Sequence, residues 1–103
     1  MLSFIELGRL GRLGNQLFQY AALRGIGIKT GFLIKIPDPA DRHWQGQDCL
    51  LKEFKIEADY LEEVDIGLLT QRYIEPAVNR FHSTVSELLD GTDLYGFFQS
   101  YRY

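Results

Sequence analysis

The first 36 residues change their hydrophobic period twice, and this change limits the folds open to the chain. Residues 2–7 form a short apolar run typical of a strand, and three glycines follow at equal spacing: Gly8, Gly11 and Gly14. Beyond them, apolar residues recur at helical spacing in one stripe: Leu17, Phe18, Ala21, Ala22, Gly25 and Ile26. Residues 32–36 are typical of a second strand. Strand, loop, helix and strand in this order predict the first βαβ unit of a parallel sheet.

The limits of the predicted helix are marked by residues with capping preferences. Asn15 precedes the helical stripe and is predicted to be its N-cap, and Gly31 is predicted to stop it at the C′ position. Gly25 and Gly27 lie inside the helix, where each costs about 1 kcal/mol relative to alanine. We therefore expect the last turn either to fray or to pack closely against a neighbour.

The rest of the chain alternates between polar and apolar stretches. The predictions are a polar loop (38–48), a short strand or turn (50–56), a helical or mixed segment (60–73), an ambiguous stretch with a helical turn near its end (79–89), and a turn (90–93). Residues 94–100 then form a strongly strand-like run, in which we expect Phe97 and Phe98 to be packing residues.

Length and composition allow one folded unit. With 103 residues, of which 46% are hydrophobic, the chain can bury one core but lacks room for two lobes with a cleft between them. We predict the α/β class, with a partial Rossmann-like parallel sheet in a single domain over residues 1–103. Because the chain stops directly after the last strand-like run, we expect this domain to be incomplete and prone to self-association.

The charge balance limits the class of partner. A net charge of −3 argues against nucleic acid, which demands a cationic excess. The first 30 residues are locally basic, because they hold Arg9, Arg12 and Arg24 but only one acid, Glu6, and this suits a small anionic ligand. The sequence has a single cysteine, no signal peptide and no apolar membrane span, so we expect a cytoplasmic protein, with peripheral membrane attachment as the alternative.

The loop of residues 11–16, Gly-Arg-Leu-Gly-Asn-Gln, is the sharpest candidate site. The first amides of a helix lack internal partners and attract anions, and glycine lets a ligand approach the backbone. Arg12 can pair with phosphate oxygens, while Asn15 and Gln16 add neutral donors. The loop matches neither a Walker A sequence nor the dinucleotide-binding fingerprint. A strand-to-helix turn without a ligand, capped by Asn15, remains the alternative.

Two stretches of the sequence resemble motifs of one enzyme family. Residues 11–22, Gly-Arg-Leu-Gly-Asn-Gln-Leu-Phe-Gln-Tyr-Ala-Ala, resemble the N-terminal motif of family 11 glycosyltransferases, the α-1,2-fucosyltransferase-like enzymes. Residues 94–103, Leu-Tyr-Gly-Phe-Phe-Gln-Ser-Tyr-Arg-Tyr, are similar to the family's Leu-x-Gly-Tyr/Phe-Phe-Gln-Ser-x-Lys/Arg-Tyr segment. The two motifs occur in the family's order, so the resemblance spans nearly the whole chain.

The resemblance implies a GT-B fold, in which two Rossmann-like lobes hold GDP-fucose in the cleft between them. It implies an inverting transfer of fucose to a glycan hydroxyl, as in galactoside 2-α-L-fucosyltransferases, without a metal ion or other cofactor. In related fucosyltransferases the matching loop faces the donor diphosphate, so the residues that the resemblance assigns to donor binding are Arg12, Gly14, Asn15 and Gln16. Oriented donors at that point would stabilise the negative charge on the leaving GDP.

One family motif is missing from the sequence. The family's C-terminal lobe carries His-x-Arg-x-Gly/Arg-Asp, whose arginine holds the donor phosphates, whereas neither His43 nor His82 is followed by an arginine two residues later. We therefore expect the chain to be the N-terminal part of such an enzyme and inactive alone. The alternatives are a catalytically silent module, which binds an anion or nucleotide sugar or pairs with a separate second lobe, and an α/β domain without a ligand.

Three further residues are candidates for the cleft or the acceptor site. Trp44 could stack on a sugar ring, although an exposed loop aromatic or a lid over the core is the more frequent role for such a residue. Gln99 and Ser100 end the last predicted strand and could reach the cleft. The two histidines lie far apart in the sequence and match no metal-ligand spacing, so we predict no metal site.

Overall fold

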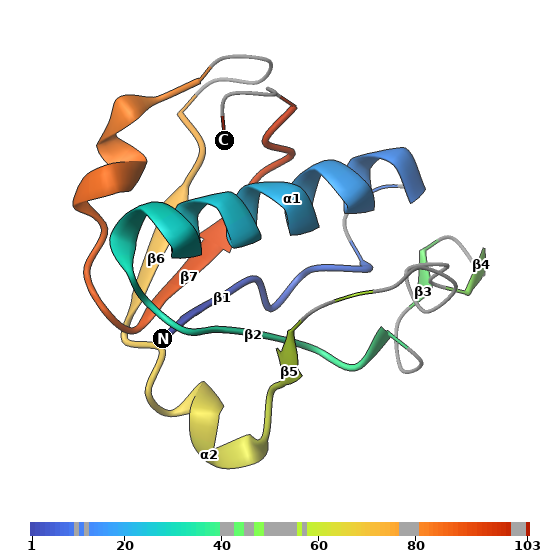
Figure 1. The fold of residues 1–103 in the computed structure, drawn as a ribbon. Helices are drawn as coiled ribbons and strands as arrows, with labels where there is room; N and C mark the ends of the chain where they lie inside the picture. The colour runs from blue at the N-terminus through green and yellow to red at the C-terminus, as the bar shows by residue number, and fades with distance from the viewer. Residues whose placement is uncertain are drawn as a thin grey trace.

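Five short strands form one parallel sheet in the computed structural model of the chain (Figure 1). They are β1 (Leu2–Ser3), β2 (Ile34–Ile36), β5 (Asp59–Tyr60), β6 (Gln71–Ile74) and β7 (Thr92–Tyr95). Their order across the sheet is β5-β2-β1-β7-β6, and every neighbouring pair is parallel, which confirms the α/β class. The structure describes residues 1–9, 11, 13–39, 56, 58–76, 81–99 and 103, and the backbone alone at 43–44 and 47–48.

Helices connect these strands and lie mainly on one side of the sheet. α1 (Leu13–Thr30) joins β1 to β2 and packs beside the 3-10 helix η3 (Ser83–Glu87), which precedes β7 (Figure 1). The short helix α2 (Glu63–Ile66) follows β5, and a separate antiparallel pair consists of β3 (His43–Trp44) and β4 (Gln47–Asp48). The chain thus moves outward from β1 through β2 to β5, crosses to β6 at the opposite edge, and returns to β7 beside β1.

The register of the strands gives the sheet one apolar and one polar face. Leu2 lies beside Ile34 in one row, and an added Cβ on Gly27 of α1 would lie 2.6 Å from Cγ2 of Ile34, so this row faces α1. That face supplies fully buried core residues such as Leu2 and Leu94. The next row, one residue further along the strands, faces the other side of the sheet and is polar. It consists of Ser3, Lys35, Arg72 and Asp93. Parallel sheets are usually apolar on both faces, so this polar row is an unusual feature of the fold.

The buried face of α1 differs from the apolar stripe that its sequence predicts. Ala22 and Ile26 are buried as predicted, but Ala21 is exposed and Phe18 is 43% exposed. The residues that face inward are instead Gln16, Gln19, Ala22, Leu23, Ile26 and Gly27. The stripe prediction therefore holds for Ala22 and Ile26, and for Leu17, which packs against the core, but it is wrong for Phe18 and Ala21. Gln16 faces inward instead, and its Nε2 donates to the Gly11 carbonyl (3.0 Å). Among the helices that the structure describes, none has the length and apolar character needed to cross a membrane.

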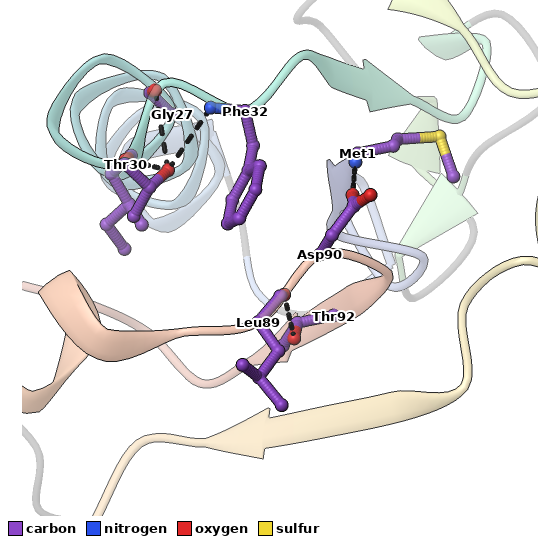
Figure 2. A network of polar contacts seen from close by, with 8 residues as sticks. Met1, Gly27, Thr30, Phe32, Leu89, Asp90 and Thr92 are labelled. Atoms are coloured by element: carbon purple, nitrogen blue, oxygen red, sulfur yellow. Dashed lines mark hydrogen bonds and ion pairs between the residues drawn. The ribbon is translucent and has the colours of Figure 1, made fainter.

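The two ends of α1 test the capping predictions. The helix begins at Leu13, so Asn15 lies inside its first turn and the N-cap prediction for Asn15 is wrong. At the other end, Gly31 adopts φ +78° and donates its N–H to the Gly27 carbonyl (2.9 Å), which confirms the predicted stop. The Thr30 hydroxyl supports this end, because it donates to the Ile26 carbonyl at 2.8 Å and accepts from the Phe32 N–H. Figure 2 shows the contact between Thr30 and Phe32.

Gly25 and Gly27, in the second half of α1, pack closely against other parts of the chain, which is one of the two outcomes predicted for them. A Cβ on Gly27 would press against Ile34 of β2, and a Cβ on Gly25 would lie far inside van der Waals contact with the backbone carbonyl of Tyr103. Tyr103 is nearly buried, and its ring meets those of Phe98 and Phe81 edge to face at centroid distances of 5.0 and 5.2 Å. The helix therefore packs closely on β2 and on the last residue of the chain.

Several predicted boundaries move in the structure. The first strand stops at Ser3 because the backbone turns there, with the Leu7 N–H bonded to the Phe4 carbonyl (2.9 Å). The segment 60–73 is mixed, as predicted, and holds α2 and most of β6, while the helical turn expected at 85–89 is a 3-10 helix two residues earlier. β7 starts inside the predicted turn, at Thr92, and stops at Tyr95. The predicted loop 38–48 contains the β3–β4 pair, and residues 50–55 lie outside the described part.

The amino ends of β1 and β7 are tied together by polar contacts. The amino group of Met1 forms an ion pair with Asp90 (Figure 2). The Gly91 N–H also donates to the Met1 carbonyl (2.8 Å). The Thr92 hydroxyl donates to the Leu89 carbonyl (2.6 Å) and holds the turn into β7. These contacts hold the register of β1 against β7 and leave the opposite, carboxyl ends of both strands for the glycine loop.

Candidate ligand-binding loop

The glycine loop lies where the strand order of the sheet changes direction. It follows the carboxyl end of β1, and the chain leaves β1 toward β2 on one side. On the other side of β1 lies β7, which is reached from β6 at the far edge. In open α/β sheets, ligands bind outside the carboxyl ends of the strands at such a reversal. Among the described residues, those that follow β1 as far as Gln16 and those of 96–99 after β7 can therefore contact a ligand there.

A hydrogen bond joins the two segments. Nε2 of Gln99 donates to Oδ1 of Asn15, and the two residues come from the two stretches with the family resemblance. The other end of the Asn15 carboxamide packs on Gly11, since a Cβ on Gly11 would lie 2.5 Å from Nδ2 of Asn15. Gly11 is buried with φ +91°, so this position needs glycine for its backbone conformation as well as for space. Asn15 is thus held between Gly11 and Gln99.

α1 begins at this region, directly after the glycine loop. The opening N–H groups of a helix have no acceptor within the helix and carry the positive end of its dipole. Gly14 lies in the first turn of α1 and is exposed. Apart from its chain neighbours and the backbone of the helix itself, no atom lies within 4 Å of the place where its Cβ would be, so a ligand can approach its Cα. Gln16 is only 3% exposed, and its Nε2 is bonded to the Gly11 carbonyl, so it holds the loop from inside the protein.

Asp93 holds the backbone where the chain leaves β1 for the glycine loop. The sequence did not predict this role, because its pattern placed Asp93 in a turn. Oδ1 of Asp93 accepts a hydrogen bond from the N–H of Ile5 (2.7 Å), the second residue beyond β1. Its Oδ2 accepts from the Arg72 guanidinium, at 3.0 Å from Nε and 2.9 Å from a terminal nitrogen, and its side chain is 4% exposed. Burial raises the pKa of Asp93 above its ordinary value, while the hydrogen bonds from Ile5 and Arg72 oppose the rise. The sequence signal that could have pointed to this role is an aspartate placed between strand-forming residues.

An apolar hollow lies beside the loop on the outer side of α1. Gly14, Leu17, Phe18 and Ala21 line it, and its volume is about 340 Å³. Gln16 is buried on the opposite side of the helix, whereas Phe18 is 43% exposed. The region thus combines exposed amides, an oriented carboxamide and an apolar wall, the mixture of a few polar groups with apolar lining that small-ligand sites show.

The structure brings together only some of the predicted site residues. Gly14, Asn15 and Gln99 lie in one region, and Gln16 supports it from within. Arg12 and Ser100 lie outside the described residues, and Trp44 belongs to β3, of which only the backbone is described, so their roles stay predictions. Among the described residues, no group of three or more histidine, cysteine, aspartate or glutamate side chains is arranged to hold a metal ion.

Comparison of the chain with protein-family models, with characterised proteins and with solved structures finds no significant match. The likeness to family 11 glycosyltransferases therefore rests on the two short motifs, and the geometry around Asn15 stands independently of it.

Proposed function

We propose that the chain binds the diphosphate of a nucleotide-sugar donor on the loop between β1 and α1, as the N-terminal Rossmann-like lobe of a GDP-fucose-dependent glycosyltransferase of the GT-B type. The observation that supports this most directly is the contact between Asn15 and Gln99. The two stretches that resemble family motifs are separated by most of the chain, yet they meet at the edge of the sheet where a ligand would bind.

The chemistry of the loop suits a diphosphate. The exposed backbone at Gly14 and the first-turn amides of α1 offer donors aligned with the helix dipole. The Asn15 carboxamide adds a neutral donor whose position is set by its neighbours, and Arg12 would add a cation. When fucose leaves GDP with inversion, negative charge grows on the diphosphate, and donors already oriented toward it stabilise that charge without reorganising.

Transfer itself demands a second set of donor contacts. The family's His-x-Arg motif occurs nowhere in this sequence, so the arginine that would hold the far side of the diphosphate must come from another lobe. The chain is therefore expected to bind GDP or GDP-fucose weakly and to transfer no fucose alone. The same missing motif favours the second candidate function, a catalytically silent module that binds a nucleotide sugar.

Titration of the full 103-residue chain with GDP, followed by amide NMR, tests the proposal. We expect saturable shifts of the Gly11, Gly14 and Asn15 amides. Asn15→Ala should weaken GDP binding about tenfold or more, because a hydrogen bond to a charged group contributes roughly 1.5–3 kcal/mol. Gln71→Ala is the control, since Gln71 is exposed at the amino end of β6 and far from the loop.

The outcome separates the alternatives. Absence of saturable GDP shifts at millimolar concentration would refute the binding proposal, as would equal losses in Asn15→Ala and Gln71→Ala. Preference for GDP over UDP would favour the fucosyltransferase assignment, because GDP-fucose is the donor that the resemblance implies. If binding of GDP-fucose is intact but mixing with a second lobe from a related enzyme restores no transfer, the silent module is the better description.

A further inference from the structure

The Asn15 carboxamide can face the loop in two ways with opposite consequences. Its nitrogen end donates hydrogen bonds and its oxygen end only accepts them, although the two ends have nearly the same shape. An anion needs the nitrogen end. In the structure, Oδ1 is taken by the Gln99 amide and Nδ2 lies over Gly11, on the side of the loop. The amide that Gln99 directs at Oδ1 therefore favours the orientation in which the nitrogen of Asn15 lies on the side of the loop.

We infer that Gln99 is a positioning residue, which holds the Asn15 carboxamide with its nitrogen toward the loop and its oxygen away from it. The consequence for ligand binding rests on the proposed function, whereas the orientation itself can be measured on the protein without a ligand. Gln99 was predicted from the sequence as a cleft or acceptor residue, and in the structure its side-chain amide donates to Asn15.

Gln99 is suited to this role because the segment that carries it is firmly held. Phe98 is fully buried and packs edge to face on Phe4 at a centroid distance of 5.8 Å. Its N–H donates to Oε1 of Glu75 (3.2 Å), which ties the segment to the end of β6. Phe98 also adopts φ +53°, a left-handed conformation that non-glycine residues seldom adopt and that often marks functional segments. The backbone turn at Phe98 buries its ring and leaves the next side chain directed at Asn15.

A contact that only stabilised the fold would tolerate reversal of its polarity. Gln99→Glu reverses it, because an ionised carboxylate accepts hydrogen bonds but cannot donate them. The Asn15 carboxamide can still bond to position 99, but only by turning its nitrogen away from Gly11. Gln99→Met removes the hydrogen bond while keeping the length of the side chain, and serves as the matched variant.

The experiment is nuclear Overhauser spectroscopy of the full chain, without ligand, followed by titration with GDP and with inorganic pyrophosphate. In the wild type we expect cross-peaks from the Asn15 side-chain NH2 to the Gly11 α-protons. In Gln99→Glu at neutral pH these cross-peaks should disappear, and in Gln99→Met they should weaken as the carboxamide samples both orientations. Acid should restore them in Gln99→Glu alone, because a protonated carboxyl group can again donate to Oδ1 of Asn15.

Binding provides the second readout. GDP and pyrophosphate affinity should fall by at least tenfold in Gln99→Glu and by a few-fold in Gln99→Met. Since the introduced carboxylate also repels anions directly, the cross-peaks of the ligand-free protein decide between the two causes. Identical Asn15–Gly11 cross-peaks in the wild type and both variants would overturn the inference, whatever the chain binds.

The two proposals fail separately. If the cross-peaks change as expected but the wild type binds neither GDP nor pyrophosphate, the orienting role of Gln99 stands and the proposed function is refuted. If Gln99→Glu does not fold, as judged by its amide spectrum, Gln99→Met alone decides: weakened cross-peaks support the inference, and unchanged cross-peaks overturn it.

Discussion

Replacement of Gly25 by alanine tests the closest helix contact in the structure. Alanine is the best helix former and glycine among the poorest, so this change in an exposed helix interior would stabilise the protein by about 1 kcal/mol. At Gly25, however, the new methyl group would lie far inside van der Waals contact with the Tyr103 backbone carbonyl. Whether Gly25→Ala raises or lowers the stability of the protein therefore shows whether Tyr103 packs on α1.

The magnitude follows from what must move. A backbone carbonyl cannot rotate away as a side-chain tip can, so Tyr103 would leave its site between Phe98 and Phe81. Loss of one large buried apolar side chain costs about 1.5–3 kcal/mol, and each edge-to-face ring pair adds roughly 0.5–1.5 kcal/mol. The sum lies between about 2.5 and 6 kcal/mol. Because Tyr103 is displaced rather than removed, we take a value near the lower end, about 3 kcal/mol, which exceeds the helix gain of about 1 kcal/mol. We expect Gly25→Ala to destabilise the fold by about 2 kcal/mol, a fall of roughly 8–16 °C in the melting temperature.

Thermal and urea unfolding of two matched variants provides the assay. Gly14→Ala makes the same chemical change in the same helix, but no atom lies within 4 Å of its new methyl group, so it should be neutral or stabilise by up to about 1 kcal/mol. Gly25→Ala in a chain without Tyr103 should likewise become stabilising. If Gly25→Ala raises the melting temperature of the full chain as much as Gly14→Ala does, Tyr103 does not pack on α1 and the reasoning is refuted.

Two further predictions concern the polar face of the sheet. Asp93→Ala leaves the Ile5 N–H without its acceptor and should lower the free energy of unfolding in urea by about 1–3 kcal/mol. Asp90→Ala removes an exposed ion pair and should lower it by at most about 1 kcal/mol. Equal losses of stability in the two variants would contradict the anchoring role of Asp93. The Glu62 N–H and the Lys35 ammonium lower the pKa of Asp65 below its ordinary value of 3.8. The ionised Asp65 therefore contributes fully to the free energy of unfolding above pH 3.8, and this contribution is lost as pH falls through the lowered pKa. The difference in unfolding free energy between wild type and Asp65→Asn should therefore shrink below pH 3.8, and a difference independent of pH would refute this.

The local sequence was sufficient to predict those features of the structure that depend on one segment alone. The change from strand to helical period predicted β1, α1 and β2, because each period reflects the geometry of one element. Gly31 marked the end of α1 because its left-handed backbone suits glycine. Phe98 was predicted to pack and is fully buried. The glycine loop was likewise visible as a candidate site from its residues alone, together with Gly14 and Asn15.

Tertiary structure decided everything that depends on which segments meet. The helical stripe could not say that Phe18 would face outward and Gln16 inward, where Gln16 bonds to the loop at Gly11. No local pattern shows that β7 lies beside β1, and only that strand order brings Gln99 to Asn15 and Asp93 to the Ile5 amide. These contacts join residues more than 80 positions apart. Periodicity is a property of neighbours along the chain, whereas the loop is shaped by neighbours across the sheet. The sequence could therefore name the residues of a candidate site but could not predict how they are arranged.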